Sequence, residues 1–141
     1  MFDSLTISQM NSGLRAKDFS AAELCEAFLA RIKEKDRQVH AYLSMSEDLA
    51  RAQAKKIDEK IATGAEINVL AGVPGAIKDV ILVEGEKCTA GSRILENYVA
   101  PCDATVVKKL KEAGAVILGK TNCDEFAMGS STENSAFGPT F

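Results

Sequence analysis

Lys78 is the residue whose type and surroundings most directly suggest chemistry. It lies within residues 76–83, a run of apolar and β-branched side chains that predicts a largely buried strand. Alternate side chains of a strand share a face, so Lys78 would lie beside Ala76, Val80 and Leu82. A lysine on such an apolar face must be paired or must lose its proton. A neutral lysine next to a serine can act as a general base.

Two structural interpretations of Lys78 remain open beside this one. The lysine could form an ion pair with an acidic side chain, or residues 76–83 could be an edge strand that leaves Lys78 in water. Neither interpretation involves a reaction. A catalytic role also needs a serine partner, so Lys78 alone predicts a candidate base and no particular substrate.

A second pattern, residues 114–121, matches the letters of a phosphate-binding loop, GxxxxGKT. A phosphate loop follows a strand and opens a helix, so that its backbone N–H groups point at the anion. Here the four variable positions are themselves predicted to form a strand, and the neighbouring helix is predicted before the pattern. Asp124 and Glu125 follow and would repel phosphate. We therefore interpret the segment as a helix-ending glycine, a buried strand and a lysine at the end of that strand.

The cysteines do not form a metal-binding pattern. Cys25, Cys88, Cys102 and Cys123 include no CxxC pair, and His40 is the single histidine. A zinc site requires a tighter cluster of ligands. We therefore predict no metal site, and we expect four reduced thiols in a cytoplasmic protein.

The elements that position these residues follow from capping signals and from the spacing of apolar side chains. Ser20 and Glu23 form one capping box, and Asp103 is expected to cap a later helix. From residue 121 onward the chain is predicted to be loop, apart from a helical turn at 124–128. The other predicted elements are a helix over 21–35, an extended segment over 40–43, a helix that starts with a capping box at 44–47 and ends at Gly64, a turn over 72–75, the strand over 76–83, a helix over 104–113 and a strand over 115–118.

This order of elements predicts an α/β fold in which helices are layered on a mainly parallel sheet. We expect a helical region over residues 1–65 and the start of an α/β core over residues 66–141. Two or three strands cannot complete such a sheet, and the last four residues contain no capping signal. The chain is therefore expected to be the N-terminal portion of a single, longer domain.

Composition excludes several classes of protein. The 141 residues carry 17 basic and 20 acidic side chains, a net charge of −3, so no basic stripe is available for a phosphate backbone. If the protein acts on a nucleic acid, we expect another chain to bind it. No apolar run approaches the roughly 18 residues of a membrane span, and the first residues have neither a signal-peptide nor a transit-peptide pattern.

Several segments, taken in order, resemble amidase-signature enzymes. Gly72-Val73-Pro74-Gly75-Ala76-Ile77-Lys78-Asp79 is similar to the lysine segment of that family. The segments that follow it in the family are matched by residues 90–92, 101–105 and 114–122. Residues 124–135, with the letters DEFAMGSSTENS, resemble in particular the branch that serves tRNA-dependent amidotransferases. The resemblance covers essentially the whole chain and is strongest from residue 70 onward.

The resemblance implies an α/β/α layered fold around a large mixed sheet and a triad of a serine nucleophile, a second serine with a cis peptide bond, and a lysine. Lys78 matches the family lysine, and both serines would lie beyond Phe141. The resemblance also implies that Met128, Gly129 and Ser130 line the substrate pocket, although a purely structural loop is an alternative there. Without its nucleophile, the chain alone is expected to be inactive.

The resemblance further implies the reaction and the partners, which are subunits B and C of the amidotransferase. The complete protein would hydrolyse glutamine, and the ammonia would pass to the B-subunit. With ATP and Mg²⁺, that partner would convert Glu-tRNA(Gln) to Gln-tRNA(Gln), and the small C-subunit would brace the pair. The tRNA would be bound mainly by the partner, and this chain would hold no cofactor. The alternatives are a free-standing small-molecule amidase of the same family and a nucleotide-binding module that uses residues 114–121.

Overall fold

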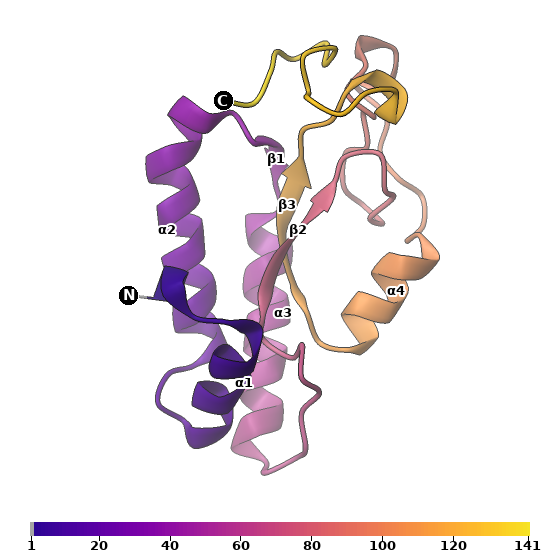
Figure 1. Cartoon of the computed structure of the whole chain (residues 1–141). Coiled ribbons are helices and arrows are strands. Elements are labelled where there is room, and N and C mark those ends of the chain that lie inside the picture. Colours follow the sequence, from indigo (N-terminus) through magenta and orange to yellow (C-terminus); the bar gives the residue numbers. More distant parts are fainter. Residues whose placement is uncertain (1) are drawn as a thin grey trace.

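Three helices form the first part of the chain in the computed structural model, which describes residues 2–141 (Figure 1). They are α1 (Ile7–Ala16), α2 (Ala21–Val39) and α3 (Glu47–Ala62), and a short 3-10 helix, η1 (Phe2–Ser4), precedes them. The patterns above did not predict α1 as a separate helix. It begins at a capping box in which Thr6 and Gln9 satisfy each other's backbone N–H groups.

Helix α2 begins at the predicted capping box of Ser20 and Glu23, which is confirmed. Its predicted end at residue 35 is wrong, because the helix continues to Val39. It stops where His40 adopts a left-handed conformation with φ of 55°. The Asp36 side chain then accepts a hydrogen bond of 2.8 Å from the backbone N–H of Ala41, which turns the chain toward the sheet.

The second predicted capping box is wrong. Helix α3 is preceded by Ser46, not Ser44, and the Ser46 side chain makes no capping hydrogen bond. The Ser46 hydroxyl instead donates to Glu86 at 2.7 Å, so it ties the start of α3 to a distant loop. Ser44 lies in the strand that precedes the helix. Tertiary contacts have therefore replaced the local cap that the sequence pattern indicates.

The sheet has three strands, β1 (Tyr42–Met45), β2 (Pro74–Lys78) and β3 (Val116–Thr121). The strand order is β1-β3-β2, in which β2 runs parallel to β3 and β1 runs antiparallel to it. The α/β class and the mixed sheet that the resemblance implied are confirmed. The expectation of a mainly parallel sheet is only half right, because one of the two strand pairings is antiparallel.

The predicted boundaries of the second strand are wrong. Strand β2 begins at Pro74, within the segment predicted as a turn, and ends at Lys78. Proline is tolerated at the first residue of a strand, where its missing N–H is not needed. The strand ends because the chain turns after Lys78, whose carbonyl accepts a hydrogen bond of 2.9 Å from the N–H of Ile81.

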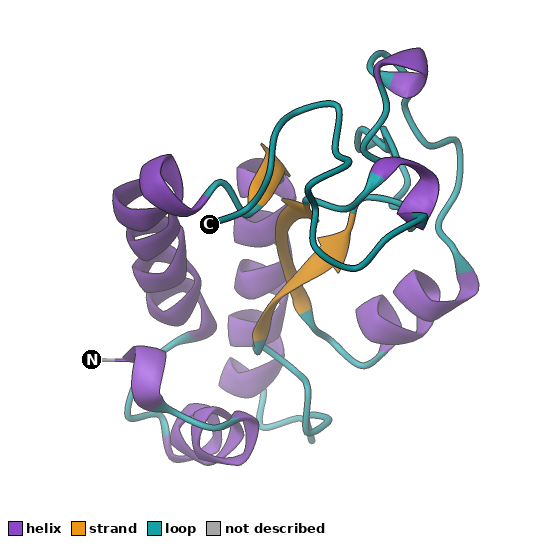
Figure 2. Ribbon diagram, turned by 45° about the horizontal axis from the view of Figure 1, so that its top comes forward, coloured by secondary structure: helices purple, strands orange, loops and turns teal. Residues whose placement is uncertain are grey.

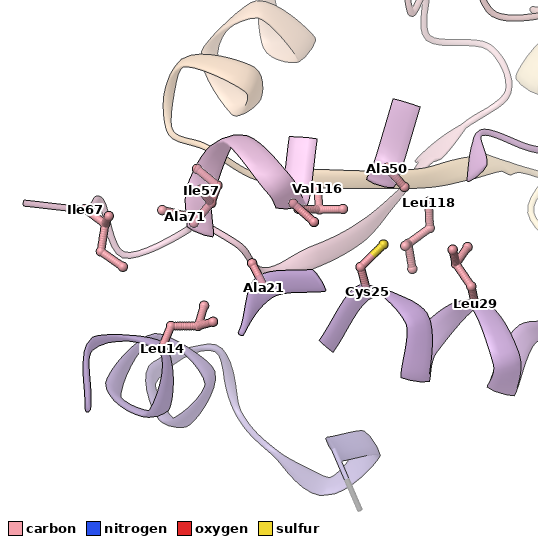
Figure 3. Packing of buried hydrophobic residues seen from close by; sticks show 11 residues of the cluster. Leu14, Ala21, Cys25, Leu29, Ala50, Ile57, Ile67, Ala71, Val116 and Leu118 are labelled. Atoms are coloured by element: carbon pink, nitrogen blue, oxygen red, sulfur yellow. The ribbon is translucent and has the colours of Figure 1, made fainter. Parts of the chain in front are cut away.

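Helices cover both faces of the central strand β3. Val116 and Leu118 point into a core formed with α2 and α3, where they pack near Cys25 and Leu29 (Figure 3). Ile117 points to the opposite face, where helix α4 (Thr105–Glu112) contributes Val107. The alternation of a strand therefore gives β3 two buried faces and builds an α/β/α arrangement.

Helix α4 begins one residue later than predicted, and Asp103 does not cap it. The Asp103 carboxylate accepts hydrogen bonds of 2.8 Å from the Glu84 N–H and from Lys111 Nζ. Two short 3-10 helices, η2 (Arg93–Leu95) and η3 (Glu125–Ala127), lie in the loops, and η3 falls within the predicted helical turn. Among residues 2–141, no helix has the length and apolar character required to cross a membrane.

Candidate active site

The carboxyl ends of β2 and β3 lie side by side, because the two strands are parallel and Lys78 is paired with Thr121. The loops that follow these strands, residues 79–92 and 122–141, gather over this edge of the sheet (Figures 1 and 2). Ligands of open α/β sheets bind outside the carboxyl ends of parallel strands. Every site residue predicted from the sequence lies on or next to these loops.

Lys78 is the last residue of β2, and its side chain is exposed. The face that it shares with Ala76 and Val80 is also exposed, whereas Ile77 and Asp79 occupy the buried face. The prediction that apolar neighbours bury Lys78 is therefore wrong for the described residues. Lys78 lies in an edge strand of this three-stranded sheet, which accounts for the exposure of its side chain.

A buried ion pair lies at this edge between Asp79 and Lys120, and the sequence patterns did not predict it. Neither residue has any measurable exposure, and Lys120 Nζ lies 3.0 Å from Asp79 Oδ1. The ion pair joins the residue after β2 to the penultimate residue of β3. The available signal was the alternation of the strand, which places Asp79 on the same face as Ile77.

Further hydrogen bonds extend this ion pair into the loop that follows β2. Asp79 Oδ2 accepts from the Thr89 N–H at 2.8 Å and from the Thr89 hydroxyl at 2.5 Å. Lys120 Nζ also donates to the carbonyl of Lys87 at 3.0 Å. Buried charges are tolerated when paired and hydrogen-bonded in this way. The network fixes the backbone next to Lys78, because the Asp79 N–H also donates to the Thr121 carbonyl at 2.9 Å.

The phosphate-loop pattern at residues 114–121 has no phosphate-binding geometry. Gly114, with φ of 83°, follows α4, and the next residues form β3. Lys120 points into the interior, where its Nζ donates hydrogen bonds to Asp79 and to a backbone carbonyl. A nucleotide phosphate needs an accessible lysine at the start of a helix. The nucleotide-binding alternative is therefore wrong, and the interpretation as a glycine, a strand and a strand-end lysine is confirmed.

Met128, Gly129 and Ser130 lie in a loop that leaves β3 through η3. Met128 is 74% exposed and Ser130 is also exposed, so this part of the loop faces outward. A buried carboxylate, Asp124, lies beneath it. Its oxygens accept hydrogen bonds of 3.0–3.1 Å from the backbone N–H groups of Ser131, Thr132 and Asn134.

Two buried thiols lie close to the same strand ends. The Cys88 Sγ donates to the Asp79 carbonyl at 3.0 Å. Burial raises the pKa of Cys88 and of Cys123, and the negative charge of Asp79 adds to the effect in both cases. A raised thiol pKa opposes formation of the nucleophilic thiolate. Within residues 2–141, no three His, Cys, Asp or Glu side chains come together as a metal site.

Comparison with known proteins places this geometry in a family. A sequence model of the amidase family, described as "Amidase", matches residues 23–141. The chain is 54% identical over 135 residues to the A-subunit of the glutamyl-tRNA(Gln) amidotransferase of Koribacter versatilis (strain Ellin345). The match covers 96% of this chain and 28% of that protein, so the chain spans less than a third of the relative's length.

Solved structures agree with the sequence comparison. The crystal structure of the glutamyl-tRNA(Gln) amidotransferase A-subunit from Thermotoga maritima superposes with a TM-score of 0.74 at 43% identity, over 99% of this chain and 27% of that one. A chain of a vestigial complex, described as revealing the origins of an s-triazine catabolic enzyme, superposes with a TM-score of 0.93 at 39% identity, over 96% of this chain and 30% of that one. With the family match covering most of the sequence, this chain belongs to the amidase family, the amidase-signature enzymes.

Proposed function

We propose that this chain is part of the glutaminase subunit of a tRNA-dependent amidotransferase. The complete protein hydrolyses glutamine and supplies ammonia for the conversion of Glu-tRNA(Gln) to Gln-tRNA(Gln). The observation that carries this proposal is the 54% identity to an amidotransferase A-subunit over almost the whole chain. Because the chain spans 28% of that relative, the activity belongs to the longer protein, and these 141 residues alone are expected to be inactive.

In this proposal Lys78 is the base of a Ser–cis-Ser–Lys triad whose serines lie beyond Phe141. Neutral Lys78 takes the proton of the nucleophilic serine through the bridging serine, and the nucleophile attacks the side-chain carbonyl of glutamine. The position of Lys78 supports this role, since its amine is exposed at the carboxyl end of β2. Because the amine is exposed in this chain, the longer protein must exclude water from it. The two serines of the triad also come from the longer protein.

The partners proposed for this chain follow from the same assignment. The B-subunit uses the ammonia, together with ATP and Mg²⁺, and binds most of the tRNA, whereas the C-subunit braces the complex. The net charge of −3 supports tRNA binding by another chain. We propose no cofactor for this chain and a cytoplasmic location for the complex. The substrate glutamine is proposed to contact Met128, Gly129 and Ser130.

The experiment that tests the role of Lys78 measures ammonia release from glutamine by the full-length protein with its two partner subunits. Lys78→Arg is the decisive variant, because arginine keeps the positive charge and the length but remains protonated at any accessible pH. We expect Lys78→Ala and Lys78→Arg both to lose about 10³-fold or more in kcat. Lys56→Ala, an exposed lysine on α3, is the matched control and should remain active.

Retained activity in Lys78→Arg, with a complex that still assembles, would show that Lys78 acts as a cation or as a structural residue. The catalytic assignment would then fail, although the family assignment would stand. Loss of activity in the Lys56→Ala control would instead point to a general loss of folding. Assembly is checked for each variant by gel filtration of the three-protein complex.

A free-standing amidase of the same family is the second candidate. It is favoured by the superposition on a bacterial aryl acylamidase of the amidase-signature family, whose TM-score of 0.89 at 27% identity exceeds the 0.74 of the Thermotoga maritima protein. The two candidates differ in their dependence on partners. Ammonia release from small amides by the full-length protein alone, unaffected by the two partner subunits, would favour the free-standing enzyme.

A further inference from the structure

We infer that Asp124 is a positioning residue for the proposed glutamine site, because it holds the loop that carries Met128, Gly129 and Ser130. The inference rests on the proposed function, in which those three residues contact glutamine. Asp124 itself does not touch the substrate in this arrangement. It follows β3 by three residues and is only 3% exposed, so its carboxylate lies under the loop.

The carboxylate binds the loop through backbone N–H groups on the far side of the predicted substrate contacts. Oδ2 accepts from Ser131 at 3.1 Å and from Thr132 at 3.0 Å, and Oδ1 accepts from Asn134 at 3.1 Å. The Asp124 carbonyl accepts from the N–H of Ala127 at 2.8 Å. One residue therefore fixes the loop both before and after Met128.

Gly129 packs directly on this carboxylate. A Cβ atom added at Gly129 would lie 2.4 Å from Asp124 Cγ and 2.7 Å from Oδ1, closer than real Cβ atoms approach other atoms. The glycine has no backbone conformation that demands it, because its φ is not positive. Its lack of a side chain is needed because the backbone must approach Asp124. Gly129 and Asp124 therefore form one contact that sets the height of the loop above the strand end.

The loop needs such a clamp because its backbone is strained. Phe126, Ala127 and Thr132 have φ of 53°, 60° and 64°, a region that side chains other than glycine seldom adopt. Conformations of this kind persist only where the surroundings hold them. Two further backbone bonds attach the loop to residues 90–91, namely Phe126 N–H to the Ala90 carbonyl at 2.7 Å and Ala136 N–H to the Gly91 carbonyl at 2.8 Å.

The charge of Asp124 matters as well as its shape. Hydrogen bonds from the N–H groups of Thr132 and Asn134 lower the pKa of Asp124, and that of Ser131 adds to them against the opposing effect of burial. The side chain is therefore an acceptor at both oxygens. Asparagine has one acceptor oxygen and an NH₂ group, which would face a backbone donor. Asp124→Asn should thus lose the hydrogen bonds that one of the two carboxylate oxygens accepts from the loop, while it keeps the size of the side chain.

The test measures KM and kcat for glutamine in the full-length protein with its two partner subunits. We expect Asp124→Asn to raise KM about tenfold or more and to change kcat less than about threefold, because the loop contacts substrate and Lys78 is unaltered. Gly129→Ala should raise KM as well. With the single variants Asp124→Ala and Gly129→Ala as references, the double variant Asp124→Ala/Gly129→Ala should raise KM by less than the product of the two single effects, because removing the carboxylate removes the clash. Glu133→Gln, an exposed carboxylate of the same loop, is the control.

Hydrogen exchange of the amides of residues 131, 132 and 134 gives a second readout. Faster exchange with an unchanged KM in Asp124→Asn would overturn the inference, because the clamp would then be structural only. A fall in kcat of about tenfold with an unchanged KM in Asp124→Asn would also overturn the inference. A wild-type complex that releases no ammonia from glutamine would overturn the proposed function, and the inference would fall with it.

Discussion

At the residue scale, Lys78 and Asp79 are neighbours in the chain that lie in opposite environments. The alternation of β2 directs Lys78 to the surface and Asp79 into the interior. An isolated buried carboxylate is too costly to keep charged, so Asp79 requires the buried Lys120 on the adjacent strand. The lysine of the phosphate-loop pattern, Lys120, therefore neutralises the buried charge of Asp79.

We predict that Lys120→Met lowers the free energy of unfolding by about 3–5 kcal/mol, because it leaves the Asp79 carboxylate buried without its partner. The double variant Asp79→Asn/Lys120→Met should lose less than Lys120→Met alone, since it removes the unpaired charge. Urea unfolding followed by circular dichroism measures both. Lys109→Met, on an exposed position of α4, is the control, with an expected change within about 0.5 kcal/mol. Equal losses in the single and double variants would mean that the pair contributes through packing and not through charge.

At the scale of single elements, β3 determines the layout. It pairs with strands on both sides and has apolar side chains on both faces, so neither its edges nor its faces are free. β1 leaves no room for a side chain at Gly119. A Cβ atom at Gly119 would lie 2.4 Å from the Ser44 carbonyl oxygen.

We predict that Gly119→Ala destabilises the chain by about 1–3 kcal/mol, since the added methyl group pushes β1 away from β3. Gly75→Ala, in β2, is a matched control, because among the described residues no atom beyond Gly75 and its two chain neighbours lies within 4 Å of its added Cβ. Thermal unfolding of the two variants measures the difference. A midpoint for Gly119→Ala equal to that of Gly75→Ala would contradict the close approach of β1.

At the scale of the whole molecule, the loops and helices are joined by a few ionised side chains. Asp103 connects the start of α4 to its last turn through Lys111 and to the preceding loop through the N–H of Glu84. Burial opposes ionisation of Asp103, but the hydrogen bonds from Lys111 and Glu84 outweigh burial, and the pKa is lowered. Contacts of this kind make the stability of the fold depend on pH.

We predict that Asp103 contributes to acid unfolding. Because its pKa is lower in the folded than in the unfolded state, its contribution is fully present above the unfolded value of about 3.9 and is lost as pH falls toward the folded value. In Asp103→Asn, the free energy of unfolding should therefore fall less steeply than in the wild type as the pH drops below about 4. Urea midpoints measured between pH 3 and pH 6 test this, with the exposed Asp18→Asn as the control. If the urea midpoints of Asp103→Asn and of the wild type fall in parallel with pH, the prediction is contradicted.

The sequence by itself determined the α/β class, the capping box at the start of α2, the existence of the buried strand that follows Gly114 and the absence of a phosphate loop. These features depend on local patterns of capping and apolar spacing, which are written in neighbouring residues. The tertiary structure alone decided that α3 starts without a side-chain cap and that β2 ends at Lys78. It also decided that the buried Asp79 pairs with Lys120, which is distant in the chain, and that the buried Asp124 accepts hydrogen bonds from the loop that follows it. These outcomes depend on which strand ends and loops meet in space, and a buried charge can be assigned only when its partner is known.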